Sequence, residues 1–463
     1  MIDRAMAERV LGAALDNGAD YAELFMEDSE TNNLELTDGR VEKATSARTH
    51  GAGVRVLLGA RSAYAYTSDT DEAELMKTAR AAAAALPGNG RTSFAPFVPH
   101  AYETPMEKPF QNVENDARVQ LIRSAAAAAK SVSNEISQVV TGYLDKVQRV
   151  LIANSEGRFV TDVRPRTRAY VRAVAMAGAE AQTGFEGPGC SMGFEAYKRA
   201  IDFDASAREA AKTAVTMLHA RECPAGFMPV VIDGGFGGVI FHEACGHSLE
   251  STSVGRGNSE FCGRLGEKIA ADCVTAIDDG TIPNAWGSIN VDDEGNAPQR
   301  NVLIENGVLT GYLIDKLGGR QLDMPATGSA RRQSYCFAPT SRMTNTYIAE
   351  GADDDEEMIS SLDSGLYARK MGGGSVNPAT GEFNFAVSEG YLIENGRIAC
   401  PVRGATLVGK GADILLKIDR VGRNRRLGQG MCGSISGLIP VNVGQPRIRV
   451  SGITVGGKGG VRE

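Results

Sequence analysis

Two of the five histidines in this 463-residue chain stand five positions apart, in the run Phe241-His242-Glu243-Ala244-Cys245-Gly246-His247. Neutral imidazoles bind Zn²⁺, and a carboxylate beside them can take a proton from a water that the metal activates. These residue types in this order therefore favour a metallohydrolase. They also constrain the fold, because side chains five positions apart on a straight α-helix point about 140° away from each other.

If both histidines bind one ion, the helix that carries them must depart from regular α geometry. A π-type bulge brings positions i and i+5 closer together, and such bulges are frequent at functional sites. Gly246, directly before the second histidine, is the residue best suited to permit this distortion. We therefore expect a π-type turn around Cys245 and Gly246. An undistorted helix would instead indicate two ordinary core histidines.

A metal ion of this kind needs a third protein ligand, and the other histidines are poor candidates. His50, His100 and His219 lie in the N-terminal half without a metal-binding context, so surface or core positions are expected for them. None of the eight cysteines belongs to a C-x-x-C pair. Cys432 lies in the glycine-rich run 428–433, where the backbone can approach another element closely. Spacing alone leaves two interpretations of Cys432 open, a zinc ligand or a free buried cysteine.

Several runs of this sequence resemble the TldD/PmbA family of peptidases. They are the H-E-x-x-x-H motif at 242–247, Ser329-Ala330-Arg331-Arg332-Gln333-Ser334-Tyr335, Arg342-Met343-Thr344-Asn345-Thr346-Tyr347, Met431-Cys432-Gly433 and Val443-Gly444-Gln445-Pro446. The likeness spans most of the chain and is most specific from about residue 225 onwards. TldD-type members have the H-E-x-x-x-H motif and a late cysteine ligand, whereas PmbA-type members lack this metal set. The chain therefore resembles the TldD type.

The resemblance implies roles for four residues. His242, His247 and Cys432 would be the metal ligands, and Glu243 would be the general base. It also implies about one Zn²⁺ per chain, with iron as the alternative metal. The implied substrates are short or unstructured peptides in extended conformation, and the implied assembly is a dimer that encloses the active sites, either a homodimer or a heterodimer with a PmbA-type subunit. An arginine or a tyrosine in the region 331–347 is a candidate oxyanion donor.

Composition agrees with a globular enzyme of the cytoplasm. Hydrophobic residues make up 42% and charged residues 23%, which is ordinary for a globular protein. The formal net charge of −8 and the absence of a basic run argue against a nucleic-acid-binding protein. Charges interrupt residues 1–9, which argues against a secretory signal, and no stretch reaches the ~20 apolar residues that span a membrane. Eight scattered cysteines suit a reducing compartment.

Turn and breaker residues divide the chain into three predicted domains, 1–105, 106–222 and 223–463. The first two repeat one order, in which a helix is followed by strands and then by a second helix. The four helices are expected at 3–17, 71–86, 112–131 and 205–220. Residues 87–110 contain five prolines and are interpreted as a linker, and residues 184–192 as a mobile loop.

The third predicted domain is mostly strand after residue 270. Hairpin turns are expected at Ile304–Gly307 and Ile393–Gly396. The glycines of 234–238 match no phosphate-binding pattern and indicate close backbone packing near the motif. The expected fold class is α+β, with mixed helix and strand N-terminal and middle domains and a β-rich C-terminal catalytic domain that carries the H-E-x-x-x-H helix.

Three other interpretations compete with a metallopeptidase. A cysteine peptidase could use Cys245 as nucleophile with a motif histidine as base, but Glu243 would then have no role. A structural-zinc subunit of a peptidase or modifier complex would use the same ligands, although structural sites normally have four. A non-catalytic subunit of the PmbA type would lack the motif.

Overall fold

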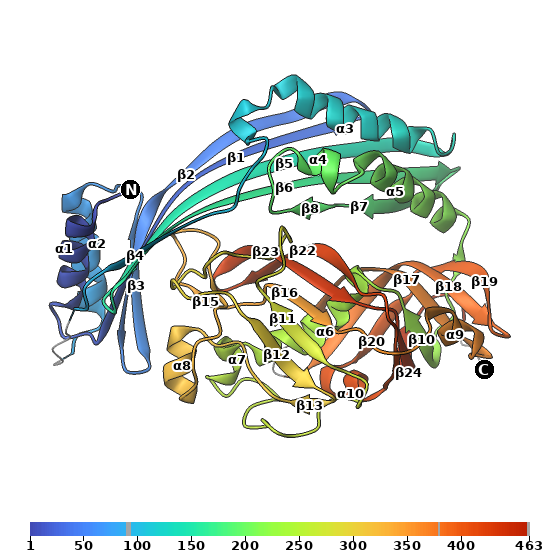
Figure 1. The fold of residues 1–463 in the computed structure, drawn as a ribbon. Helices are drawn as coiled ribbons and strands as arrows, with labels where there is room; N and C mark the ends of the chain where they lie inside the picture. The colour runs from blue at the N-terminus through green and yellow to red at the C-terminus, as the bar shows by residue number, and fades with distance from the viewer. Residues whose placement is uncertain (89–93, 378–379, 461–463) are drawn as a thin grey trace.

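The computed structural model describes residues 1–88, 94–377 and 380–460 and confirms the expected α+β class. One long, curved sheet arches over a second body that contains the other sheets (Figure 1). None of the helices in these ranges has both the length and the apolar composition that a membrane crossing requires. The chain thus has two layers, and the histidine motif lies in the second one.

The long sheet contains strands from the first and the second predicted domain. Its strands are β1 (Tyr21–Thr37), β2 (Arg40–Leu58), β3 (Arg61–Thr67), β4 (Val98–Glu103), β5 (Ile136–Asn154), β6 (Arg158–Ala177), β7 (Glu180–Glu186) and β8 (Gly189–Cys190). The order is β3-β2-β1-β5-β6-β4, and β7 and β8 also pair with β6. β1 and β5 pair antiparallel from Glu23 opposite Asn154 to Thr37 opposite Val140. The two predicted domains therefore share one hydrogen-bonded sheet, and the boundary at residue 105 remains a proposal.

Four alanine-rich helices pack on this sheet, and each lies within three residues of its predicted position. They are α1 (Arg4–Leu15), α2 (Glu72–Ala85), α3 (Asn115–Lys130) and α5 (Phe203–Leu218). Asp3, Asp71 and Asp202 cap α1, α2 and α5 by accepting a backbone N–H of the first turn. α3 and α5 lie on the convex side of the sheet (Figure 1). The concave side is thereby left to face the C-terminal body.

Two segments that were expected to be irregular belong to this sheet, so these predictions were wrong. Part of the predicted linker forms β4, which pairs parallel with β6; residues 89–93 of that linker lie outside the described residues. β4 is an exposed edge strand, so it has no apolar alternation, and Pro99 is tolerated there. The predicted mobile loop contributes to β7 and β8. Gly184 serves packing in this segment, because a Cβ there would collide with the backbone of Ala210 in α5.

The C-terminal body contains two larger sheets and one two-stranded ladder. The first sheet is built from β9 (Arg221–Glu222), β10 (Gly226–Ile232), β17 (Ser364–Val376), β18 (Glu382–Glu394), β19 (Arg397–Arg403), β20 (Thr406–Lys410), β21 (Ile418–Val421) and β24 (Ile448–Gly456). The second is built from β11 (Ala276–Asp279), β12 (Arg300–Glu305), β13 (Val308–Leu309), β16 (Asn345–Ile348), β22 (Arg426–Ser434) and β23 (Gly437–Gln445). The ladder joins β14 (Ala330–Arg331) to β15 (Thr340–Ser341).

Strand pairing confirms both predicted hairpins of this body, because β12 pairs antiparallel with β13 and β18 with β19. The first sheet has the order β17-β10-β24-β20-β18-β19-β9, with β21 on β24. The second has the order β13-β12-β11-β16-β23-β22, which leaves β22 at an edge. This edge strand carries Cys432.

Short helices connect the strands. They are η1 (Phe110–Asn112), α4 (Ala196–Arg199), η2 (Phe236–Gly238), α6 (Val239–Ala244), η3 (Gly246–Leu249), α7 (Ser251–Val254), α8 (Lys316–Leu322), α9 (Asp355–Ser360) and α10 (Gly411–Leu416). Helix α6 carries the first half of the histidine motif and lies in the main apolar core of the C-terminal body. Ile240, Phe241 and Ala244 are fully buried there, so the helix is held by packing on several sides.

Candidate metal centre

The histidine motif follows strand β10 through a glycine loop. Gly235 has a φ of +74°, which lies in the left-handed region that favours glycine. Gly238 lies directly against β23, where a Cβ would collide with the backbone of Gly444. The expectation of close backbone packing in this loop is therefore confirmed. The contact places the start of α6 on the sheet whose edge strand carries Cys432.

The helix breaks between the two histidines. α6 ends at Ala244, Cys245 has φ −133° and ψ −45°, and the chain continues as the 3₁₀ helix η3. The predicted π-type bulge is wrong, because the amide of Cys245 still donates to the carbonyl of Phe241, an ordinary α-helical bond. A departure from α geometry at Cys245 and Gly246 was nevertheless correctly expected. It turns His247 toward the side of His242.

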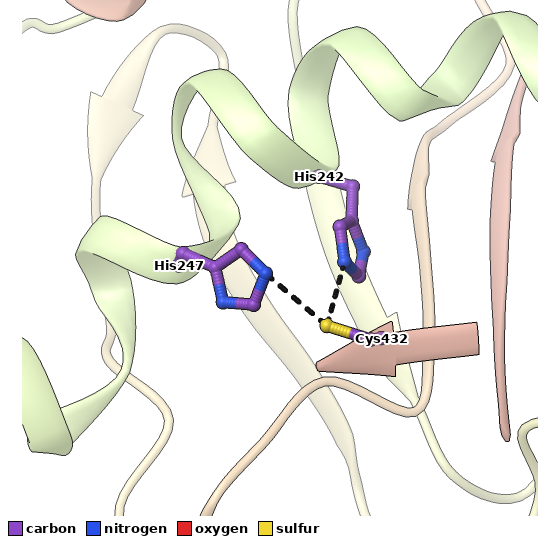
Figure 2. A group of neighbouring side chains, drawn as sticks. All are labelled: His242, His247 and Cys432. Carbon is purple, nitrogen blue, oxygen red and sulfur yellow. Dashed lines mark hydrogen bonds between the residues drawn. The ribbon is translucent and has the colours of Figure 1, made fainter. Parts of the chain in front are cut away.

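Three side chains converge at this break (Figure 2). Nε2 of His242 lies 3.3 Å and Nε2 of His247 lies 3.1 Å from Sγ of Cys432. The three ligand atoms lie within 4.8 Å of one another, and the chain's other three histidines are outside this group. Tetrahedral zinc with bond lengths of ~2.0–2.3 Å separates a nitrogen and a sulfur ligand by about 3.5 Å. The donor atoms therefore fit one zinc ion after small adjustments.

Arg342 fixes the strand that carries Cys432. Its fully buried guanidinium donates to the carbonyl oxygens of Cys432 and Gly437 at 2.7 and 3.0 Å, and to the hydroxyl of Ser436 at 2.9 Å. Arg342 belongs to the region in which an oxyanion donor was expected. In this structure its hydrogen bonds hold the backbone of the β22–β23 hairpin.

A buried carboxylate orients the second imidazole. Oε2 of Glu250 lies 3.2 Å from Nδ1 of His247, and the other oxygen accepts the backbone N–H of Met343 at 3.3 Å. Because Nδ1 contacts Glu250, Nε2 of His247 points toward the sulfur of Cys432, the orientation that a metal ligand requires. Sequence reasoning missed Glu250, whose only signal was its position three residues after His247. Among the described residues, nothing forms a hydrogen bond with the buried Nδ1 of His242.

The charges of the three side chains suit a divalent cation. Burial disfavours the thiolate of Cys432, but the imidazoles of His242 and His247 outweigh burial and lower the pKa of this thiol to about 3. Burial also disfavours the charged form of His247, but Glu250 and Cys432 raise the pKa of its imidazole well above the usual value. Without metal, a thiolate thus lies beside an imidazolium, and a metal would replace the proton of the imidazolium.

Glu243 and Cys245 lie in different surroundings. The side chain of Glu243 is 24% exposed, and its Oε2 lies 3.9 Å from Nε2 of His247, so it borders both the cluster and solvent. Cys245 is fully buried, and burial raises the pKa of its thiol well above the usual value. A buried neutral thiol is a poor nucleophile. This arrangement argues against a cysteine peptidase.

Comparison with known proteins identifies the family. Profiles described as PmbA/TldA metallopeptidase domain 1, central domain and C-terminal domain match residues 22–86, 108–218 and 225–457. A metalloprotease TldD homolog of Haemophilus influenzae is 35% identical over 449 residues, which cover 95% of this chain and 93% of that protein. The chain belongs to the TldD/PmbA family of metallopeptidases.

One further relative and two solved structures are similar to this chain over nearly its whole extent. A zinc metalloprotease TldD homolog of Saccharolobus solfataricus is 24% identical over 441 residues, which cover 95% of this chain and 97% of that protein. The crystal structure of TldE from Thermococcus kodakarensis has a TM-score of 0.77 at 17% identity, and covers 97% of this chain and 99% of that one. A Thermotoga maritima structure reaches a TM-score of 0.80 at 20% identity, with coverage of 98% and 99%. The chain is thus similar to metalloproteases over 95% of its residues and has the TldD/PmbA fold.

Proposed function

We propose that this chain is a zinc-dependent, TldD-type peptidase that hydrolyses short or unstructured peptides. The observation that carries the proposal is the convergence of His242, His247 and Cys432, three metal-binding side chains from two distant segments of the chain. A His₂Cys set with a fourth position left for water or substrate is typical of catalytic zinc. Iron is the alternative metal, because the same donors also accept it.

Each proposed role follows from the position of the side chain. The two Nε2 atoms and Sγ hold the metal, and Glu250 and Arg342 keep two of these ligands in place. Zinc in such a site supplies a Lewis acid that polarises a carbonyl and acidifies water. Glu243 accepts the proton of the attacking water and passes it to the leaving amine. Its partial exposure beside the cluster suits this transfer, because substrate and water can reach it.

We further propose that the chain acts as a dimer, either with itself or with a PmbA-type subunit, and takes peptides in extended conformation. The competing function is a structural-zinc subunit of a peptidase or modifier complex. A site with three protein ligands and a carboxylate beside it favours catalysis over that alternative, since structural zinc sites are normally closed by four ligands.

Removal and return of the metal test the proposed function. We expect the purified chain to contain about one zinc, to cleave an unstructured peptide, to lose this activity after dialysis against a chelator and to regain it with zinc. Elemental analysis measures the zinc content, and mass spectrometry of the digest measures peptide cleavage. A zinc-loaded chain that leaves every unstructured peptide intact would favour the structural-zinc subunit. Restoration by iron alone would identify iron as the metal.

Zinc binding should release protons at neutral pH. The raised pKa of His247 means that its imidazole is protonated in the metal-free site, whereas Cys432, with a pKa of about 3, is already a thiolate. At pH values below the raised pKa of His247, each zinc ion must displace about one proton. The affinity for zinc should therefore rise about tenfold for each unit by which the pH increases. Titration of metal-free chain in weakly buffered solution between pH 6 and 8 measures the release. A pH-independent affinity would contradict this charge assignment.

A further inference from the structure

A cavity of about 580 Å³ lies between the concave side of the long sheet and the C-terminal body. This volume falls within the range of ~300–1,000 Å³ that is usual for ligand sites. The sheet contributes strands β1, β5, β6 and β7, and the β22–β23 hairpin contributes Met431 and Leu438. In Figure 1 this hairpin lies directly below the arch of the sheet.

The cavity and the metal centre both border the β22–β23 hairpin. Successive side chains of a strand point to opposite faces. Met431, which lines the cavity, is 42% exposed, whereas the next residue, Cys432, is 5% exposed and faces the histidines. A ligand in the cavity is therefore close to the strand that holds a candidate metal ligand.

Basic side chains dominate the charged part of the lining, with seven basic and three acidic residues. Strand β6 contributes arginines at alternate positions, Arg164, Arg166 and Arg168, which the period of two places on one face. Arg166 also lies directly opposite Lys146 of β5, and like charges in this arrangement destabilise a sheet. Local pairing of the strands therefore does not explain why the cations are gathered here.

Three arginines of the lining, Arg166, Arg168 and Arg331, form hydrogen bonds only with backbone carbonyls among the described residues. Arg166 donates to Trp286 and Ser288 at 3.3 and 3.2 Å, Arg168 to Gly187 and Gln429 at 3.0 and 3.4 Å, and Arg331 to Met343 at 2.8 Å. Arg166 and Arg331 are 7% and 4% exposed. Buried charges are ordinarily paired with opposite ones.

The nearby carboxylate of Asp293 is already engaged by other groups. It accepts from Arg164 at 2.7 Å and from the backbone N–H of Arg332 at 2.7 Å. Burial and the charge of Arg164 lower the pKa of Arg166 to about 10. Burial and the charge of Arg166 lower the pKa of Arg331 to about 9. Both values still leave the side chains charged at neutral pH. Among the described residues, Arg166, Arg168 and Arg331 form no salt bridge, and the carboxylates of Asp162, Asp278 and Asp293 act on Arg166 or Arg331 only from a greater distance.

We propose that Arg166, Arg168 and Arg331 bind carboxylate groups of the peptide substrate, so that the enzyme prefers acidic peptides. The inference rests on the proposed peptidase function. A guanidinium matches a carboxylate with two parallel hydrogen bonds, and the burial of Arg166 and Arg331 strengthens such bonds. Apolar side chains such as Trp286 and Leu438 line the same space and suit the non-polar parts of a peptide. A peptide held here lies against the hairpin that leads to the metal centre.

The chain's single tryptophan gives a readout inside the cavity. Trp286 is 3% exposed, and the guanidinium of Arg168 lies 5.8 Å from its ring centroid. We propose to titrate the Glu243→Gln chain, which should turn over the peptide about 10²-fold more slowly than the wild type, with tryptophan-free octapeptides and to follow Trp286 emission. One peptide carries aspartate and glutamate, a second carries asparagine and glutamine at the same positions, and both are made with a free or an amidated C-terminus.

The acidic octapeptide should bind about tenfold or more tightly than its amide counterpart. Arg166→Gln and Arg331→Gln should reduce this preference to about twofold or less, while the binding of the amide peptide stays nearly unchanged. Arg168→Gln, a change at a partly exposed position that tolerates substitution better, should weaken the preference in the same direction. Arg149→Gln is the control, because it removes one positive charge outside the cavity.

Comparison of the free and amidated C-termini distinguishes a side-chain carboxylate from the terminal one. Equal affinities for the acidic and amide peptides would overturn the proposal, and so would a preference that survives all three arginine changes. Binding tests the carboxylate site, whereas cleavage tests the peptidase function. If the wild-type chain cleaves neither peptide but the preference is present, the peptidase function fails and the carboxylate site stands.

Discussion

Replacing Cys432 with alanine is expected to remove zinc binding and peptide hydrolysis together. The sulfur lies 3.1 and 3.3 Å from the two imidazole nitrogens, so its loss leaves two neutral ligands and no anionic one. Loss of an outer partner of a metal ligand already costs ~10–100-fold in metal affinity, and loss of the ligand itself should cost more. Elemental analysis of Cys432→Ala, purified without chelator, should therefore show almost no zinc, and peptide cleavage should fall to background.

Cys262→Ala is the matched control for this change. Cys262 is a partly buried free cysteine outside the histidine cluster, so its replacement should retain both zinc and activity. Circular dichroism of both variants shows whether the fold persists. Full metal occupancy in Cys432→Ala would exclude Cys432 from the site and would leave His242 and His247 without the third ligand proposed for them.

The Glu243→Gln variant should keep its zinc but lose catalysis by about 10²-fold or more, the usual contribution of a positioned acid–base group. Glutamine has nearly the same size and can form hydrogen bonds, but it cannot accept the proton of the attacking water. The side chain lies beside the cluster without belonging to it, so metal content should remain that of the wild type. Initial rates with an unstructured peptide, paired with elemental analysis, measure both effects.

A folded protein is the negative control for this assay. It should resist cleavage by the wild-type chain, because an active site enclosed by the proposed dimer would admit only extended chain. Undiminished peptide cleavage by Glu243→Gln would refute the role of Glu243 as base. Rapid cleavage of the folded control would instead refute the enclosed site and leave the metal chemistry intact.

Local patterns predicted the regular elements of this fold well. Apolar periodicity and alanine-rich runs located the helices α1, α2, α3 and α5, and the turns at Ile304–Gly307 and Ile393–Gly396 located two hairpins. The exposed edge strand β4 was missed because neither face of it is buried. The form of the helix break at Cys245 was also beyond local reasoning. Either a bulge or a break would redirect His247, so the sequence alone does not distinguish them. The contact of Gly246 with Met343, at the position of the break, is a tertiary contact that the local sequence does not reveal.

The histidine pair was visible in the sequence, but most of its supporting contacts were not. Arg342 and Glu250 act through contacts with Cys432 and His247 that depend on the folded chain. The alternate arginines of β6 were visible as well, yet their burial depends on Trp286 and Arg331, more than a hundred positions later. Period and spacing identify which side chains share a face, whereas only the assembled fold determines what covers that face.

The order of the ligands along the chain has a consequence for synthesis on the ribosome. His247 and Cys432 are 185 residues apart, and at ~5–20 residues per second the last ligand is made on the order of 10–40 s after the first two. During that interval the nascent polypeptide has the imidazoles but no thiolate to complete the set. An unfolded growing chain is itself the kind of substrate proposed for this enzyme. Late synthesis of the β22–β23 hairpin thus delays activity until most of the molecule has left the ribosome and can fold.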